Sequence, residues 1–233
     1  MTQRGLHGQL LETLGQAITS GAIPGGHVLR IEELAARHGV SRTVAREAVR
    51  VLESMRLVHS RPKVGTTVRP GTEWNLFDPQ VVRWRLAGTR RGAQLRELSE
   101  VRAAVEPAAG ALAARTATEE QRAELLELAA ELSRLAGLGE VDRFVEVDVA
   151  FHRLVLTASG NEMFAHLGDF TAEALRGRNR LHLMPAVPDA VATRRHLEVA
   201  RAIAEAEPAR AEELLRQIVA SAAAEVESLL ARK

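Results

Sequence analysis

The chain has 233 residues, of which 46% are hydrophobic and 26% charged, and its formal net charge is +1 at pH 7. This composition is typical of a folded protein of one or two domains and excludes an intrinsically disordered chain. The sequence has no cysteine, which excludes disulfides and thiolate metal sites, and no apolar run long enough for a membrane helix or a secretory signal, so we expect a cytoplasmic protein.

The charge is unevenly distributed along the chain. Residues 1–70 contain ten Lys or Arg and five Glu, a net charge of +5. Subtracting these from the totals of 31 basic and 30 acidic residues leaves 21 and 25 in residues 71–233, a net charge of −4. A basic first third indicates that this part of the chain meets a polyanion, although solvated surface charge produces the same split by chance.

The first 70 residues are predicted to form, in order, a helix, a short helix, a tight turn, a third helix and a hairpin. Apolar residues at helical spacing predict helices over 6–20 and about 31–38. Ser41 is a typical N-cap for the third helix, which runs to about residue 56. Residues 58–69 are rich in Val and Thr and contain a turn signal, which predicts a two-stranded wing.

The remainder is predicted to be helical after a connecting segment. Residues 71–91 predict a linker whose Trp and Phe side chains pack between a domain over 1–70 and a second domain over 92–233. Glycine and proline punctuate the helices of the second domain. We expect these helices near 93–115, 118–136, 141–159, 161–182, 190–206 and 208–231.

The third predicted helix carries side chains suited to DNA. Arg42, Thr43, Arg46 and Arg50 lie at its start and along its outer side, away from its apolar face. Short polar residues at a helix N-terminus can donate to phosphate, and arginines one turn further can reach guanine edges in the major groove. Two helices joined by a tight turn also occur in proteins that do not bind DNA, so this pattern alone leaves both interpretations open.

Three segments together favour the DNA-binding interpretation. SGAIPGG, IEELAARHGVSRTVAREAVRVLESMRLV and RPKVGTTV resemble the GntR family of bacterial regulators over about 60 positions. The resemblance implies a winged helix-turn-helix whose Arg42 and Arg46 contact bases or phosphates. Glu32 stands where many members have a DNA-contacting arginine, which predicts a different operator sequence. The full set of residues implied to contact DNA is Ser41, Arg42, Thr43, Arg46, Lys63 and Gly65, with the hydroxyls on phosphates and Gly65 at the minor groove.

A possible metal site lies in the second domain. Asp148 and His152 are one helical turn apart, and His196 falls in a later helix. One carboxylate and two imidazoles suit a divalent transition metal. A surface ion pair between Asp148 and His152 is the alternative interpretation.

ELSEVRAAVEPAAGALAAR, DVAFHRLVLTASGN and TRRHLEVARAIAEAEPARAEELLRQI resemble the FadR-type C-terminal domain of GntR regulators, called FCD. The resemblance implies an antiparallel all-helical bundle around an effector cavity, which in this family often holds a metal through one Asp and three His. We expect a divalent transition metal in this chain, Zn first, with Ni or Mn as alternatives. Asp148, His152 and His196 match three of these ligands, and Gln217 is expected at the fourth position. Arg102 is expected to bind an effector carboxylate, and Glu106 to form an i,i+4 ion pair.

The linker suggests an effector class. WNLFDPQVVRWRL resembles the corresponding segment of regulators of sugar-acid catabolism. We therefore expect a homodimeric repressor that leaves a pseudo-palindromic operator when a carboxylate such as gluconate or galactonate binds. A metal-free regulator that responds to fatty acyl compounds is the alternative. A metal-dependent hydrolase is disfavoured because no general base or nucleophile motif accompanies the trio.

Overall fold

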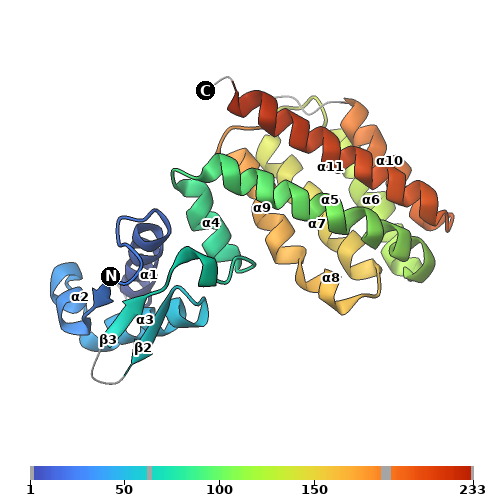
Figure 1. Cartoon of the computed structure of the whole chain (residues 1–233). Coiled ribbons are helices and arrows are strands. Elements are labelled where there is room, and N and C mark those ends of the chain that lie inside the picture. The colour runs from blue at the N-terminus through green and yellow to red at the C-terminus, as the bar shows by residue number, and fades with distance from the viewer. Residues whose placement is uncertain (1–2, 62–64, 185–189, 232–233) are drawn as a thin grey trace. The chain divides into compact units, whose positions relative to one another are not determined.

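The computed structural model describes residues 3–61, 65–184 and 190–231. The chain divides into two compact units, Met1–Arg91 and Gly92–Lys233. The structure confirms the predicted fold class, a winged helix-turn-helix followed by an all-helical unit (Figure 1). None of the helices in the described residues is long and apolar enough to cross a membrane.

The first unit combines a helix-turn-helix with a small antiparallel sheet. The strands lie in the order β1-β3-β2, with Val58 opposite Val68 and Leu29 opposite Thr66. The sequence predicted the β2–β3 hairpin but missed β1, which is two residues long and follows a turn. The elements are α1 (Gln3–Thr19), β1 (Val28–Leu29), α2 (Ile31–His38), α3 (Arg42–Ser54), β2 (Val58–Arg61), β3 (Gly65–Val68), η1 (Gly71–Glu73) and α4 (Pro79–Ala87).

Local chemistry sets the geometry of the helix-turn-helix. Gly39 ends α2 with a left-handed φ of 64°, which glycine adopts without steric cost. Ser41 then caps α3 and accepts a hydrogen bond from the backbone nitrogen of Val44 at 3.2 Å. Val44, Ala48 and Leu52 repeat at helical spacing and are buried in the core of the unit. The opposite side of α3 is therefore left for solvent or a ligand.

The segment after the wing forms part of the first unit. Asp78 caps α4 by accepting hydrogen bonds from the backbone nitrogens of Gln80 and Val81. Trp84, which is 1% exposed, packs directly against Gly15 of α1, where a β-carbon would overlap the indole ring. Burial of this large aromatic side chain anchors α4 to the helix-turn-helix core.

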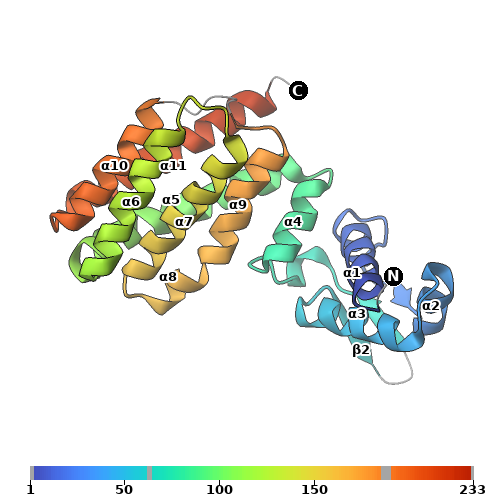
Figure 2. The ribbon, with the colours of Figure 1, turned by 180° about the vertical axis from the view of Figure 1, so that it is seen from behind.

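The second unit is a bundle of helices (Figures 1 and 2). Neighbouring helices contact in the order α9, α7, α6, α10, α11. Helix α5 runs beside α11, where Arg96 donates to Glu227 at 2.6 Å. The helices are α5 (Arg91–Thr116), α6 (Glu119–Leu135), α7 (Val141–Ala158), α8 (Glu162–His166), α9 (Gly168–Arg180), α10 (Ala190–Ala204) and α11 (Pro208–Leu230).

One predicted helix is divided in the structure. The sequence predicted a single helix over 161–182, whereas Leu167 is the C-cap of α8 and the N-cap of α9, with a ψ of −4° where a regular α-helix has about −42°. Gly168 follows, and a β-carbon there would lie 3.1 Å from the Arg153 side chain. Close packing against α7 therefore accompanies the break, and apolar periodicity does not report it.

Candidate functional site

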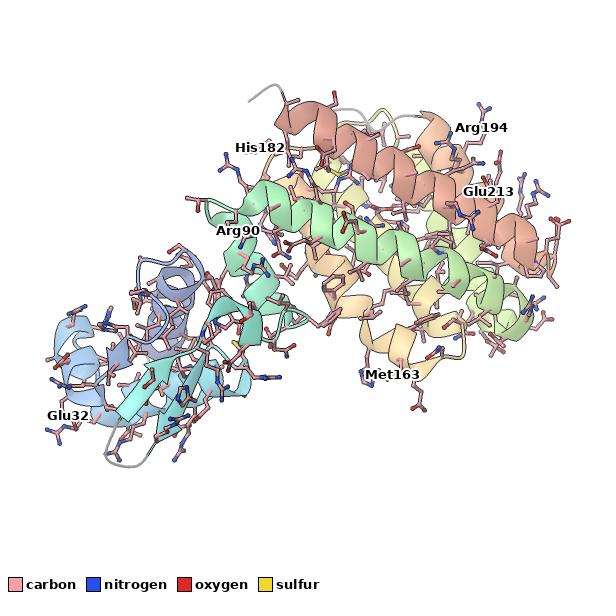
Figure 3. The ribbon with its side chains drawn as sticks, viewed as in Figure 1. Glu32, Arg90, Met163, His182, Arg194 and Glu213 are labelled. Carbon is pink, nitrogen blue, oxygen red and sulfur yellow. The ribbon has the colours of Figure 1, made fainter. Side chains whose placement is uncertain are left out.

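The N-terminal part of α3 presents a polar, cationic surface. Ser41, Arg42, Thr43 and Arg46 are all exposed, on the side of α3 opposite its buried residues. The Arg42 guanidinium lies 4.0 Å from the carboxylate of Glu32, which projects from the outside of α2 (Figure 3). The structure thus brings four of the predicted DNA-contacting residues to one surface and places an acidic group beside them.

The wing is described on either side of its tip. Gly65 opens β3 with a φ of 99°, and a β-carbon there would lie 3.1 Å from Val28. Both the backbone conformation and the contact favour glycine at this position. Lys63, the remaining predicted DNA-contacting residue, lies outside the described residues.

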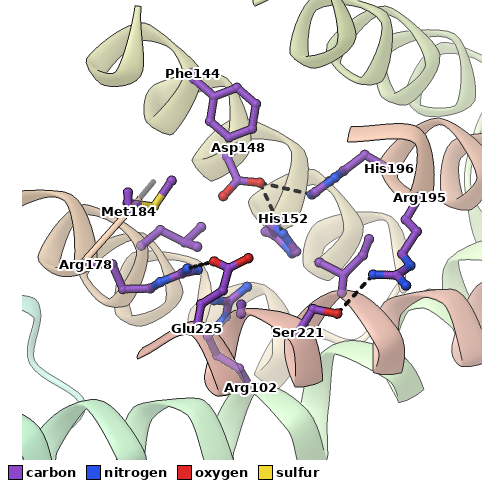
Figure 4. A pocket seen from close by; sticks show the side chains of 13 residues that line it. Arg102, Phe144, Asp148, His152, Arg178, Met184, Arg195, His196, Ser221 and Glu225 are labelled. Carbon is purple, nitrogen blue, oxygen red and sulfur yellow. Dashed lines mark hydrogen bonds and ion pairs between the residues drawn. The ribbon is translucent and has the colours of Figure 1, made fainter. Parts of the chain in front are cut away.

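Asp148, His152 and His196 meet inside the second unit, although α7 supplies the first two and α10 the third. Asp148 Oδ1 lies 3.1 Å from His196 Nε2 and 3.4 Å from His152 Nε2 (Figure 4). One candidate ligand atom from each residue lies within 4.8 Å of the other two, and all three side chains are buried. A surface ion pair, the alternative interpretation of Asp148 and His152, is therefore wrong.

A second buried carboxylate stands behind this trio. Glu106 Oε2 lies 2.8 Å from His152 Nδ1, the ring nitrogen that faces away from Asp148. Arg102 donates to both oxygens of Glu106, at 2.6 and 3.1 Å. The predicted Arg102–Glu106 pair is present, but sequence reasoning missed the contact of Glu106 with His152. A carboxylate on the outer nitrogen of an imidazole is the arrangement that fixes the orientation of metal-binding histidines.

The buried charges change one another's protonation. Burial alone would raise the pKa of Glu106, but the attraction of Arg102 and His152 outweighs it and lowers that pKa to about 2. Burial would likewise lower the pKa of His152, but the charges of Glu106 and Asp148 raise it to about 9. Burial opposes ionisation of Asp148 too, yet its two histidine neighbours hold its pKa well below the usual range. Glu106, Asp148 and His152 therefore hold one another in their charged forms.

Asp148, His152 and His196 line a cavity of about 60 Å³. Arg102 lies in its wall, as the resemblance implied, and two further arginines join it, Arg178 from α9 and Arg195 from α10. Arg178 donates to Glu225 at 2.9 Å, and Arg195 donates to the Ser221 hydroxyl at 3.0 Å (Figure 4). Sequence reasoning missed these lining residues. Only the position of Arg195, directly before His196, could have indicated one of them.

Gln217 does not reach this cavity. Its side chain is exposed and donates at 3.0 Å to Glu213, which lies on the outer side of α11 (Figure 3). Its neighbour Ile218 lines the cavity instead. One residue along a helix turns a side chain by about 100°, so an assignment shifted by one position points the wrong way. We therefore correct the expectation that Gln217 contacts a metal or effector.

Comparison with known families identifies both units. Residues 6–68 match the family of bacterial regulatory proteins called gntR, and residues 97–221, more than half of the chain, match the FCD domain. The chain belongs to the GntR family of transcriptional regulators, in the subgroup with an FCD domain. It is a DNA-binding regulator, and the hydrolase alternative is discarded because the family is one of transcription factors, not enzymes.

Two relatives of this GntR regulator come from Escherichia coli strain K12. The helix-turn-helix transcriptional regulator YieP is 36% identical over 160 residues, which cover 68% of this chain and 70% of YieP. The galactonate operon transcriptional repressor is 31% identical over 160 residues, which cover 68% of this chain and 69% of the repressor.

Solved structures share the fold at lower identity. The Listeria monocytogenes regulator Lar superposes with a TM-score of 0.61 at 18% identity, covering 98% of both chains. Escherichia coli McbR/YncC superposes with a TM-score of 0.57 at 20% identity, covering 97% of this GntR regulator and 98% of McbR/YncC.

Proposed function

We propose that this GntR regulator is a homodimeric repressor that leaves its operator when a small carboxylate of the sugar-acid type binds beside a divalent transition metal in the FCD cavity. Residues 1–70 would bind DNA, residues 92–233 would bind the effector, and residues 71–91 would connect them. The observation that carries the proposal is the convergence of Asp148, His152 and His196 on one arginine-lined cavity.

The DNA-binding part rests on the exposed surface of α3. Arg42 and Arg46 would enter the major groove and contact bases or phosphates, while Ser41 and Thr43 would donate to phosphates. Gly65 would let the wing approach the minor groove, with Lys63 beside it. A dimer would present this surface twice to a pseudo-palindrome. Because several cations would neutralise phosphates, operator affinity would fall steeply as salt increases.

The donor set fits a transition metal. Two imidazole nitrogens and one carboxylate are a common set for Zn, with Ni or Mn as further candidates, and three protein ligands leave positions for water or an effector. Asp148 Oδ1 is buried within 3.4 Å of both imidazoles, and it has no hydrogen bond of good geometry in the described part of the chain. When bound, the metal would supply a Lewis-acidic point to which a hydroxy acid can chelate.

The cavity favours a compact anion over an acyl chain. Its volume of about 60 Å³ accommodates a few water-sized groups, and three arginines contribute to its wall. A fatty acyl chain needs a long apolar tunnel, so the metal-free acyl-responsive alternative is disfavoured. A 2-hydroxy carboxylate suits both the metal and the guanidinium groups. One relative regulates a galactonate operon, which makes galactonate the first compound to test.

The test is effector-dependent release from an operator selected out of a random DNA library. We expect galactonate or gluconate to lower operator affinity of the Zn-loaded protein, measured by fluorescence anisotropy, and to have no effect after chelation. A hundredfold loss of affinity corresponds to about 2.7 kcal/mol of coupling. His152→Ala should abolish the response, whereas His166→Ala, at an exposed position of α8, should preserve it. Release that persists in the chelated protein would refute the metal-assisted mechanism.

A further inference from the structure

One of the buried arginines of the cavity, Arg178, forms an ion pair with the half-exposed carboxylate of Glu225. Arg178 is 7% exposed, and one of its terminal nitrogens donates to Glu225 Oε2 at 2.9 Å (Figure 4). Its Nε is also buried and has no hydrogen-bond partner in the described part of the chain. Glu225 therefore satisfies only part of a planar fork that can hold a carboxylate through two parallel hydrogen bonds.

The surroundings of Arg178 disfavour its positive charge unless an anion lies beside it. Burial and the neighbouring charge of Arg102 lower the pKa of Arg178, and Glu225 opposes this shift. Arg102 is already held by both oxygens of Glu106. A buried guanidinium beside another cation needs an anion near it, and Glu225 supplies that charge in the ligand-free protein.

The carboxylates that pair with Arg102 and Arg178 differ in how easily they can leave. Glu106 is 1% exposed and bridges Arg102 and His152, so its departure would leave Arg102 without its ion-pair partner and His152 with Asp148 alone. The Glu225 side chain is 39% exposed. It can rotate into water at little cost in solvation, provided that another anion takes its place on Arg178.

We propose that Arg178 anchors the carboxylate of the effector and that Glu225 is its displaceable counter-ion, an internal competitor for the same guanidinium. This inference rests on the proposed function in one respect, that the effector is a carboxylate bound in this cavity. Displacement removes an ion pair between α9 and α11, so effector binding alters the contacts of α11. Ligand affinity is then set by competition with Glu225 as well as by direct contacts.

Three variants of the full chain separate competition from general electrostatics. Acetate is the probe because it carries a carboxylate and little else. Glu225→Gln should increase the affinity for acetate about tenfold, because it removes the charge that competes for Arg178. Arg178→Gln should abolish acetate binding. Glu227→Gln is the matched control, since Glu227 lies on the same helix and pairs with Arg96 outside the cavity. The readout is stabilisation of the metal-free protein by acetate relative to chloride at equal ionic strength.

Galactonate titrations of the same variants, followed by calorimetry, should give the same order of affinity, with Glu225→Gln tightest and Arg178→Gln weakest. The inference is overturned if Glu225→Gln binds acetate no more tightly than Glu227→Gln, or if Arg178→Gln still binds it. Failure of galactonate to release the operator would count against the proposed function alone, because the acetate comparison does not depend on the effector's identity. If galactonate releases the operator but Glu225→Gln binds galactonate no more tightly than the unmodified protein does, the result would count against the inference alone.

Discussion

Replacing Glu106 with Gln should destabilise the FCD unit far more than an ordinary loss of one surface charge. The substitution preserves the shape of the side chain but removes the charge that faces Arg102 and His152. Breaking a buried ion pair from one side costs about 3–5 kcal/mol because the remaining charge is uncompensated. The lowering of the Glu106 pKa from 4.5 to about 2 corresponds to about 3 kcal/mol, which agrees in magnitude.

Urea unfolding at neutral pH in the presence of chelator measures this loss, and the chain provides an internal reference. Its two tryptophans, Trp74 and Trp84, both belong to the first unit, so fluorescence reports that unit, whereas most helical circular dichroism comes from the second. The circular dichroism transition should move to lower urea and the fluorescence transition should stay. Glu213→Gln breaks an exposed ion pair with Arg216 and should cost less than about 1 kcal/mol.

The same variant also has a spectroscopic signature. Without the Glu106 charge, the pKa of His152 should fall from about 9, which an NMR titration of the imidazole can follow. If Glu106→Gln unfolded at the same urea concentration as Glu213→Gln, the buried network would contribute no stability and our account of it would be refuted.

Three other perturbations test separate parts of the molecule. Arg46→Ala should weaken operator binding by about 1–3 kcal/mol and reduce its salt dependence, whereas exposed Arg201→Ala, in the second unit, should do neither. In the metal-free protein, the raised pKa of His152 provides stability that is fully present below pH 6.5 and is lost as pH rises through about 9. Zinc affinity should rise over the same interval, because zinc must displace the proton of the His152 imidazole. Gly15→Ala should destabilise the first unit by about 1–3 kcal/mol through its clash with the buried indole, whereas Gly8→Ala, with no atom within 4 Å, should be neutral or stabilising.

Each of these three expectations has a clear contradiction. Wild-type operator affinity in Arg46→Ala would show that α3 is not the recognition helix. A metal-free unfolding free energy that stays constant between pH 6.5 and 10 would mean that His152 titrates near its ordinary pKa. Equal fluorescence transitions for Gly15→Ala and Gly8→Ala would show that the packing of α4 against α1 is loose.

The DNA-binding half could be predicted well because its determinants are local. Three features define the helix-turn-helix: the N-cap Ser41, the left-handed Gly39 and the apolar spacing along α3. Each depends on the type and order of a few neighbouring residues, so it can be read from the sequence. β1 was missed because two residues carry no period and the strand exists only through its pairing with β3. The break at Leu167 was missed for a similar reason, since packing against a neighbouring helix accompanies it.

The candidate metal trio could be predicted from the sequence only in part. Spacing placed Asp148 and His152 on one face of a helix, and residue type made His196 the third candidate ligand, which the family resemblance supported. The burial of the three side chains and the distances among them come from the packing of α7 against other helices. Whether such a pair is a surface ion pair or a buried cluster depends on which face of the helix the bundle covers.

The sequence by itself therefore determined the fold class, the regulator family and the type of chemistry available. Only the tertiary structure placed Glu106 behind His152, turned Gln217 outward and paired Arg178 with Glu225, 47 positions away. The physical reason is that helix periodicity is a property of neighbouring residues. Which side chains meet across a bundle depends instead on the rotation and offset of whole helices, and these are set by the packing of the core.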